Sequence, residues 1–417
     1  MKRAMIDLAG SLPQGESRPR RRFSPVTSLL ICFTVAFILA LSRRHAPWYP
    51  YAEDGRIFYQ QANDLGLRSL FVPDGGYLHV GLRIMALFLA QFPPSMMPYA
   101  MVTAALAIQA GLATFIFSEE VSNLVPSQFY RGLFAFIYIG LPDIDEVYGH
   151  FVNSQWHLAI LSTLLIFGRT PATRRGKIVR LVFVTILSLT GPFVAFLLPP
   201  TAYKYFRTRS RYNLGLLLCT IPSCVQICSV FLSDRPTRPW HDLALPLAIP
   251  RTFGGRGFLS AAIAPDLFRQ YYVNGPVLWA SMFGVVVLCI YAVAERKQFS
   301  ALLIYMGACI IVTSLRGGVG SVGTRMDPTF SNRYFFIFGF GLLSTIVLIL
   351  ASEKRWVRVV TVGCVATILA VSWQLPYPEA FWPKYQAALQ RYDRAVPGTR
   401  VEFPEVPKEW TFSIRKR

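Results

Sequence analysis

Residues 25–42 read PVTSLLICFTVAFILALS and contain no charged side chain. A helix of about 20 predominantly apolar residues is long enough to span the hydrocarbon core of a bilayer. Lys2, Arg3, Arg18 and Arg20–Arg22 precede the run, and basic residues mark the cytoplasmic end of a span. No clear small-residue cleavage site, as in a removable signal peptide, ends the run. We therefore predict a first transmembrane helix with its N-terminus in the cytoplasm.

Ten further apolar runs follow this one along the chain. They cover residues 96–118, 129–142, 154–168, 178–190, 193–206, 213–232, 276–294, 299–315, 334–351 and 357–373. Hydrophobic residues make up 53% of the 417 residues and charged residues only 15%, whereas soluble domains carry about 25% charged residues. This composition excludes a soluble multidomain protein. It predicts an all-α polytopic membrane protein with about 11 transmembrane helices.

The apolar run 78–92 differs from these spans because it contains Arg83 and ends at Pro93-Pro94. Counting it as a span would move the Arg-rich segment 169–180 to the outer side of the membrane. We therefore predict that 78–92 is an amphipathic helix on the outer membrane surface, within a first outer loop 43–95.

The formal net charge of +20 would indicate a nucleic-acid partner in a soluble protein. The predicted threading divides it into +15 on the cytoplasmic side and +5 on the outer side. Basic residues near span ends fix the orientation and attract anionic membrane lipids. The charge therefore predicts topology and membrane lipid contacts, and no nucleic-acid partner.

The threading gives three parts. They are a cytoplasmic segment 1–24, a transmembrane domain 25–373 with outer loops 43–95, 143–153, 233–275 and 316–333, and an outer tail 374–417. The tail is polar and rich in proline, and it is too short for a core of its own. We expect it to lie over the outer face.

The first candidate site is the acid pair Glu53-Asp54, just beyond the first span. A carboxylate at the membrane surface can take a proton from an acceptor hydroxyl or hold a divalent ion. The alternative is a pair of acids that stabilises the N-terminal turn of a helix.

The second candidate site is the short outer loop that carries Asp143, Asp145, Glu146 and His150. Acids together with one histidine would suit a divalent cation such as Mg or Mn, the one cofactor that the sequence suggests. The alternative is a solvated loop whose acids cap helices.

The third candidate site is a set of arginines in the outer segments. Arg325 and Arg333 lie in or at the end of the glycine-rich loop 316–333, which re-enters the membrane at Asn332-Arg333-Tyr334. Backbone N–H groups of such a loop and arginine forks both suit phosphate oxygens. Arg83 needs a partner at its depth, and lipid phosphate is the simplest one.

These features together resemble the GT-C superfamily, the membrane glycosyltransferases that use polyprenyl-phosphate-linked sugars. The stretch Glu53-Asp54-Gly55, Gly75-Gly76-Tyr77-Leu78-His79 and Arg83 is similar to the first loop of bacterial members. The resemblance covers the architecture of roughly residues 25–350, and many members carry a larger folded outer domain than this tail.

The resemblance implies an inverting transfer in which Asp54, or Glu53, is the general base. Asp143, Asp145 or Glu146, with His150, would hold the acceptor or a metal ion, and Arg325 and Arg333, assisted by Arg83, would hold the lipid phosphate. The substrate would be lined by Tyr77, His79, Asn153, Gln155, Trp156, Asn332 and Tyr334. The acceptor would be an envelope glycan, lipid or protein on the outer face of a bacterial inner membrane.

Two other functions stay open at this point. An envelope polysaccharide polymerase or ligase also has many spans and arginine-rich outer loops, but its acceptor chemistry would lie in late loops and Glu53-Asp54 would be dispensable. A flippase or transporter of lipid-linked sugar predicts ionisable residues near span centres and a repeat in the two halves. The predicted spans have almost no charge near their centres, and the sequence has no evident repeat.

Overall fold

The structure is a computed structural model. It describes residues 24–43, 48–141, 146–232, 248–262, 271, 274–295, 297–316, 332–350, 359, 362–363, 381–406 and 410–416. These residues are mostly helical, and among them four helices are long and apolar enough to cross a membrane. These are α1 (Pro25–Arg43), α4 (Met97–Phe117), α9 (Arg211–Leu232) and α12 (Gly275–Ala294). The prediction of a helical membrane protein is confirmed in this coarser form, and the number of spans stays a prediction.

The remaining predicted runs also form helices where the structure describes them. They are α5 (Gln128–Gly140), α6 (Ser154–Phe167), α7 (Arg174–Ser188), α8 (Leu198–Thr208), α13 (Gln298–Arg316) and α15 (Phe336–Leu350). A 3₁₀ turn, Pro192–Leu197, leads into α8. The run 357–373 lies almost entirely outside the described residues.

The run 78–92 forms a single short helix, α3 (Val80–Leu89). Its 10 residues rise about 15 Å, about half of the hydrocarbon thickness of a bilayer. Its first residue is tied to the end of α7, because the Val80 N–H donates to the Leu189 carbonyl at 3.0 Å. This length agrees with a surface helix better than with a span.

Helix ends predicted to lie on the same side of the membrane lie together. On the side predicted to be cytoplasmic, Arg180 of α7 pairs with Glu120 beyond α4, and Lys204 of α8 donates to the Ile166 carbonyl of α6 at 2.7 Å. On the outer side, Arg43 at the end of α1 donates to the carbonyls of Ile139 and Leu141 at 2.8 and 2.5 Å. These contacts join helix ends that the threading assigns to the same side, and the orientation itself stays a prediction.

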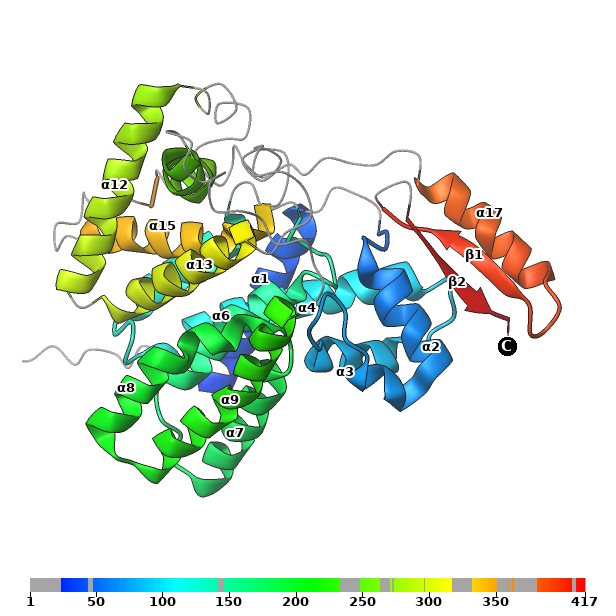
Figure 1. Ribbon diagram of the computed structural model, residues 1–417, viewed down its shortest axis with the longest axis horizontal. Helices are drawn as coiled ribbons and strands as arrows, with labels where there is room; N and C mark the ends of the chain where they lie inside the picture. The colour runs from blue at the N-terminus through cyan, green and yellow to red at the C-terminus, as the bar shows by residue number, and fades with distance from the viewer. Residues whose placement is uncertain are drawn as a thin grey trace, which may run out of the picture.

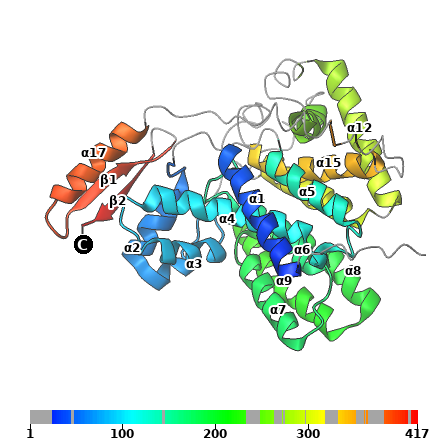
Figure 2. The ribbon, with the colours of Figure 1, turned by 180° about the vertical axis from the view of Figure 1, so that it is seen from behind.

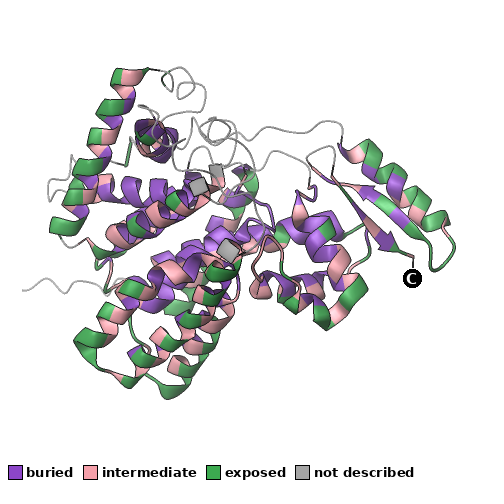
Figure 3. Ribbon diagram, in the orientation of Figure 1, coloured by how far each residue is buried: buried purple, intermediate pink, exposed green. Residues whose placement is uncertain are grey.

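The helices differ in how far their side chains are buried. Figure 3 shows buried residues concentrated in α15, whereas α8 and α12 display exposed surface. The exposed side chains of α12 are large and apolar, with Phe283 and Val293 each 71% exposed. A contiguous apolar surface of this kind is stable when lipid or another protein covers it, so it supports a membrane environment.

The predicted outer segment 233–275 contains a packed helical element in its described part. A π-helical turn, Pro250–Leu259, continues into α10 (Ser260–Ala262). A Cβ on Gly254 would lie 2.7 Å from the Leu278 carbonyl oxygen, so only glycine lets this turn approach α12 so closely. Arg256 in the same turn is fully buried, with its guanidinium 4.8 Å from the Phe335 ring centroid.

The C-terminal tail forms a small α/β unit beside the first outer loop. It consists of α17 (Phe381–Arg394) and an antiparallel hairpin of β1 (Arg400–Pro404) and β2 (Thr411–Arg415). Figures 1 and 2 show this unit at one end of the molecule, next to α2 (Gln61–Leu65) and α3, with α7, α8 and α9 away from it. The hairpin is an element that the all-α prediction did not include.

The tail shares its core with the first loop, as expected for a segment too short to fold alone. Tyr385, Phe403 and Phe412 are buried in one cluster with Phe58 and Tyr59 of the first loop. The Tyr385 hydroxyl also donates to the Pro94 carbonyl at 2.7 Å. The tail therefore covers the first outer loop, the region of the first predicted site.

Candidate functional site

The first acid pair begins a π-helical turn, Asp54–Gln60. Such turns are rare and occur frequently at functional sites. Ala52, which immediately precedes the pair, has a φ of 50°, in the left-handed region that residues other than glycine seldom adopt. Its N–H donates to the Val406 carbonyl of the tail at 2.5 Å. The tail therefore helps to hold the bend that presents Glu53 and Asp54.

Asp54 joins the first outer loop to the second. Its side chain is 1% exposed, and its two oxygens accept the N–H groups of Tyr51 at 3.1 Å and Val152 at 2.7 Å. Burial raises the pKa of Asp54 to about 7, although these N–H groups oppose the shift. Asp54 thus holds its own turn through Tyr51 and the second loop through Val152, which is 98 positions away from it.

The Glu53 side chain is less buried than that of Asp54, and it lies near several charged side chains. Burial raises the pKa of its carboxyl, while the positive charges of Arg333 and Arg56 oppose that shift. Asp74 adds a further negative charge nearby. Glu53 therefore belongs to a mixed-charge cluster in which Arg333 is the principal cation.

Arg333, at the end of the predicted loop 316–333, connects the second predicted site to Glu53. Its backbone N–H donates to Glu146 Oε2 at 3.4 Å, across 187 positions of sequence. Burial opposes the charge of Arg333, but Tyr334 and the carboxylates of Glu146 and Glu53 raise its pKa overall. The structure therefore gathers Glu53, Glu146 and Arg333, three side chains that the sequence nominated separately.

The second loop rests on the first through an aromatic stack and hydrogen bonds. The His150 ring stacks on Tyr51, with centroids 4.1 Å apart and planes 26° apart. The Asn153 side-chain amide donates to the Glu146 carbonyl. His150 and Asn153 thus shape the loop that presents Glu146.

Gln155 and Trp156 line the adjoining part of α6. The Trp156 ring lies 4.6 Å from Phe193 and 5.4 Å from Tyr334. Within the described chain, neither Trp156 Nε1 nor Gln155 Oε1 has a hydrogen-bond partner, although both atoms are buried. Buried polar atoms are normally satisfied, so these two suit polar groups of a bound molecule.

Arg83 and His79 form a second polar group at the start of α3. Arg83 is 1% exposed, and its Nη1 donates to Gln61 Oε1 at 2.8 Å. Its Nε and Nη2 find no acceptor among the described residues. Burial and the charge of Arg83 lower the pKa of His79 to about 3, so His79 is neutral. Two buried guanidinium donors are therefore available to an anion.

A groove adjoins this second polar group. It has a volume of about 710 Å³ and runs between residues 71–78 of the first loop and α9. Its walls are mostly apolar, including Phe71, Ile221 and Val225, and Tyr77 lines it as well. The Tyr77 ring is 4.6 Å from that of His79. The groove therefore runs along an apolar helix surface to Tyr77, whose ring contacts that of His79.

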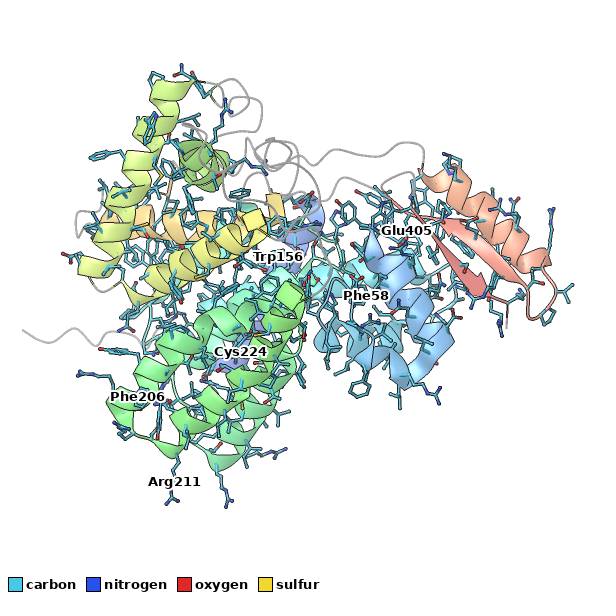
Figure 4. The ribbon with its side chains drawn as sticks, in the orientation of Figure 1. Phe58, Trp156, Phe206, Arg211, Cys224 and Glu405 are labelled. Atoms are coloured by element: carbon cyan, nitrogen blue, oxygen red, sulfur yellow. The ribbon has the colours of Figure 1, made fainter. Side chains whose placement is uncertain are left out.

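Glu405, from the tail, is a site residue that sequence reasoning missed. Its Oε1 accepts the Gly55 N–H at 2.5 Å, and it is 1% exposed. A Cβ on Gly55 would lie 2.3 Å from the Phe412 ring, so glycine is needed here. Figure 4 labels Phe58 of the first loop, Trp156 of α6 and Glu405 of the tail, in the middle part of the molecule. Nothing in the local sequence around Glu405 signals this contact.

The pKa of Glu405 predicts how stability changes with pH. Burial, with a contribution from the Asp54 charge, raises it to about 8 from 4.5 in the unfolded chain. The folded state thus holds this proton more tightly, so the stabilisation is full below pH 4.5 and is lost as pH rises through 8. Between pH 6 and 9, the melting temperature of Glu405→Gln should therefore fall less than that of the wild type.

The matched control for that measurement is Glu402→Gln, the same chemical change at an exposed position of β1. Its melting curve should follow the wild-type pH dependence, since its side chain is exposed. Identical pH dependence of the wild type and Glu405→Gln would contradict the burial of an ionisable Glu405.

Several predicted residues lie where no side-chain geometry is given. Asp143, Asp145 and Arg325 are outside the described residues, and Asn332 is described only as the first backbone position of a 3₁₀ turn, Asn332–Tyr334. Within the described ranges, no three His, Cys, Asp or Glu side chains come together as a metal site. The divalent cation therefore stays a prediction that depends on Asp143 and Asp145.

Comparison of the chain with protein-family models, with curated proteins and with solved structures gives no match.

Proposed function

We propose that this chain is an inverting membrane glycosyltransferase of the GT-C type. It moves a sugar from a polyprenyl-phosphate-linked donor to a hydroxyl of an envelope glycan, lipid or protein. The observation that carries the proposal is the meeting of Glu53, Glu146 and Arg333 from three distant segments. A base and a phosphate-binding cation are the groups that this reaction requires, and Glu146 adds a second acid beside them.

Glu53 is the general base in this proposal, and Asp54 is a positioning residue. A base must have an oxygen available to the acceptor hydroxyl, whereas Asp54 is 1% exposed and each of its oxygens already accepts a backbone N–H group. Glu53 takes the hydroxyl proton as the acceptor oxygen attacks the anomeric carbon. The bond from that carbon to the phosphate oxygen breaks, and polyprenyl phosphate leaves with the electron pair.

Arg333 stabilises the leaving phosphate, because a phosphate needs charge stabilisation more than protonation. Arg83 assists with the two donors that have no acceptor among the described residues. The apolar groove between the first loop and α9 suits the isoprenoid chain of the donor. Glu146, Gln155 and Trp156 border the acceptor.

The proposed topology has about 11 spans, with the N-terminus in the cytoplasm and the site on the outer face. The basic contacts at helix ends that the threading places on the cytoplasmic side support it. The outer surface of a bacterial inner membrane lacks nucleotide sugars, so an activated sugar reaches it on a lipid.

The direct test supplies the purified protein in lipid nanodiscs with polyprenyl-phosphate sugars and an envelope glycan acceptor. Transfer with inverted anomeric configuration, read by nuclear magnetic resonance of the product, is the expected result. The same protein in proteoliposomes should not move intact donor across the bilayer. Movement of the intact donor without transfer would overturn the enzyme assignment in favour of a flippase.

Asp54→Asn tests the positioning role. Asparagine presents an NH₂ group to one of the two backbone N–H groups, so one hydrogen bond between buried groups is replaced by repulsion. We expect the free energy of unfolding to fall by about 1 to 3 kcal/mol and the transfer rate to fall less than in Glu53→Gln. Full stability with a complete loss of transfer would instead assign the base to Asp54.

A further inference from the structure

A second cavity has a volume of about 1020 Å³ and shares no lining residue with the proposed site. The α8 helix, which supplies part of its wall, lies away from α2, α3 and the C-terminal unit (Figures 1 and 2). It lies between the end of α6, α8 and the first half of α13. Arg169, Lys204 and Arg207 line it, and no Asp or Glu of the described chain does. The cavity is therefore cationic, unlike the mixed-charge site around Arg333.

The acidic residues in the adjoining turn do not neutralise this cavity. Glu119 pairs with Arg131, and Glu120 pairs with Arg180. Throughout the part of the chain that the structure describes, no ion pair involves Arg169, Lys204 or Arg207. Their three positive charges are therefore uncompensated by the described chain and favour an anionic ligand.

Lys204 is held in a fixed place by the end of α6. Its ammonium donates to the Ile166 carbonyl at 2.7 Å and lies 5.6 Å from the Phe167 ring centroid. An ammonium has three donors, so this contact leaves capacity for a ligand. Arg169 and Arg207 are exposed at the rim, where their forked donors can reach phosphate oxygens.

The surroundings of the cavity indicate a lipid and not a free anion. Tyr203 lines it and is 67% exposed, and the neighbouring Phe206 is 58% exposed. Figure 4 shows Phe206 and Arg211 projecting away from the bundle at this end. Exposed aromatic rings beside basic side chains are typical of the membrane–water boundary. Pro199 and Leu302 add apolar wall, which acyl chains would cover.

We propose that this cavity binds one anionic phospholipid, with the headgroup phosphate held by Arg169, Lys204 and Arg207. Basic pockets between transmembrane helices on the cytoplasmic side bind anionic headgroups in this way. The site is distinct from the sugar-transfer centre, so its occupancy does not depend on that function.

Native mass spectrometry of the full chain in detergent tests the proposal. The wild type should retain one added phosphatidylglycerol and no phosphatidylcholine. Arg169→Gln with Arg207→Gln should weaken phosphatidylglycerol binding by about tenfold to thirtyfold, the loss expected for two cationic contacts at a membrane surface. The double variant Arg174→Gln with Arg175→Gln also removes two positive charges, but from the exposed first turn of α7, which does not line the cavity. This control should bind as the wild type does.

Three outcomes would overturn the proposal. The first is equal lipid binding by the wild type and the cavity variant. The second is an equal loss in the control variant, which would assign the effect to general surface charge. The third is displacement of the lipid by millimolar inorganic phosphate, which would identify a soluble-anion site. Melting curves of both variants verify that each protein is folded.

Discussion

Glu53→Gln should lower the rate of sugar transfer at least a hundredfold and leave the melting temperature close to that of the wild type. Glutamine has the shape of glutamate but cannot take up the acceptor proton, and general base catalysis contributes about 10² to 10⁴ in rate. Glu53 is only partly buried and, unlike Asp54, does not tie the second loop to the first. Initial rates with a labelled polyprenyl-phosphate sugar in nanodiscs measure this loss.

Glu402→Gln is the control for this prediction, because it makes the same change at an exposed position of the adjacent tail. It should keep wild-type transfer. Normal transfer by Glu53→Gln would refute the base assignment and favour an enzyme whose acceptor chemistry lies in late loops. A large fall in melting temperature would show instead that Glu53 is structural.

The helices could be predicted closely from the sequence because a bilayer imposes a length on each span. The first run, 25–42, forms the helix Pro25–Arg43, and the run 276–294 forms Gly275–Ala294. Arg83 and the double proline correctly marked 78–92 as different from these. In each case, the signal lies within the segment itself, in apolar length and charge.

The pairing of loops could not be predicted, because its cause lies far away in the sequence. In the sequence, the adjacent acids Glu53 and Asp54 look equivalent. The structure distinguishes them, because Asp54 accepts the N–H of Val152, 98 positions away. Glu405 is 350 positions from Gly55, and the tail pattern predicted only a polar covering. Likewise, the buried Arg256 lies in a glycine-rich segment that suggested a loop.

Arg333 contacts Glu146 of the second loop and lies beside Glu53 of the first. Arg333→Gln should lower the transfer rate about 10²- to 10³-fold, as loss of one charge-stabilising group does elsewhere. Arg333→Lys should retain more activity, since lysine keeps the charge but loses the forked donors. Arg391→Gln, an exposed arginine in the last turn of α17, is the matched control and should transfer at the wild-type rate.

A second measurement separates this role from a simple loss of folding. The positive charge of Arg333 lowers the pKa of Glu53, so its removal should raise that pKa further above its ordinary value. If Glu53 acts only when ionised, the acid limb of the pH–rate profile should move to higher pH in Arg333→Gln and stay in place in Arg391→Gln. A reduced rate with an unmoved acid limb would mean that Arg333 does not act on the same centre as Glu53. Such a result would mean that Glu53 and Arg333 do not belong to one catalytic site.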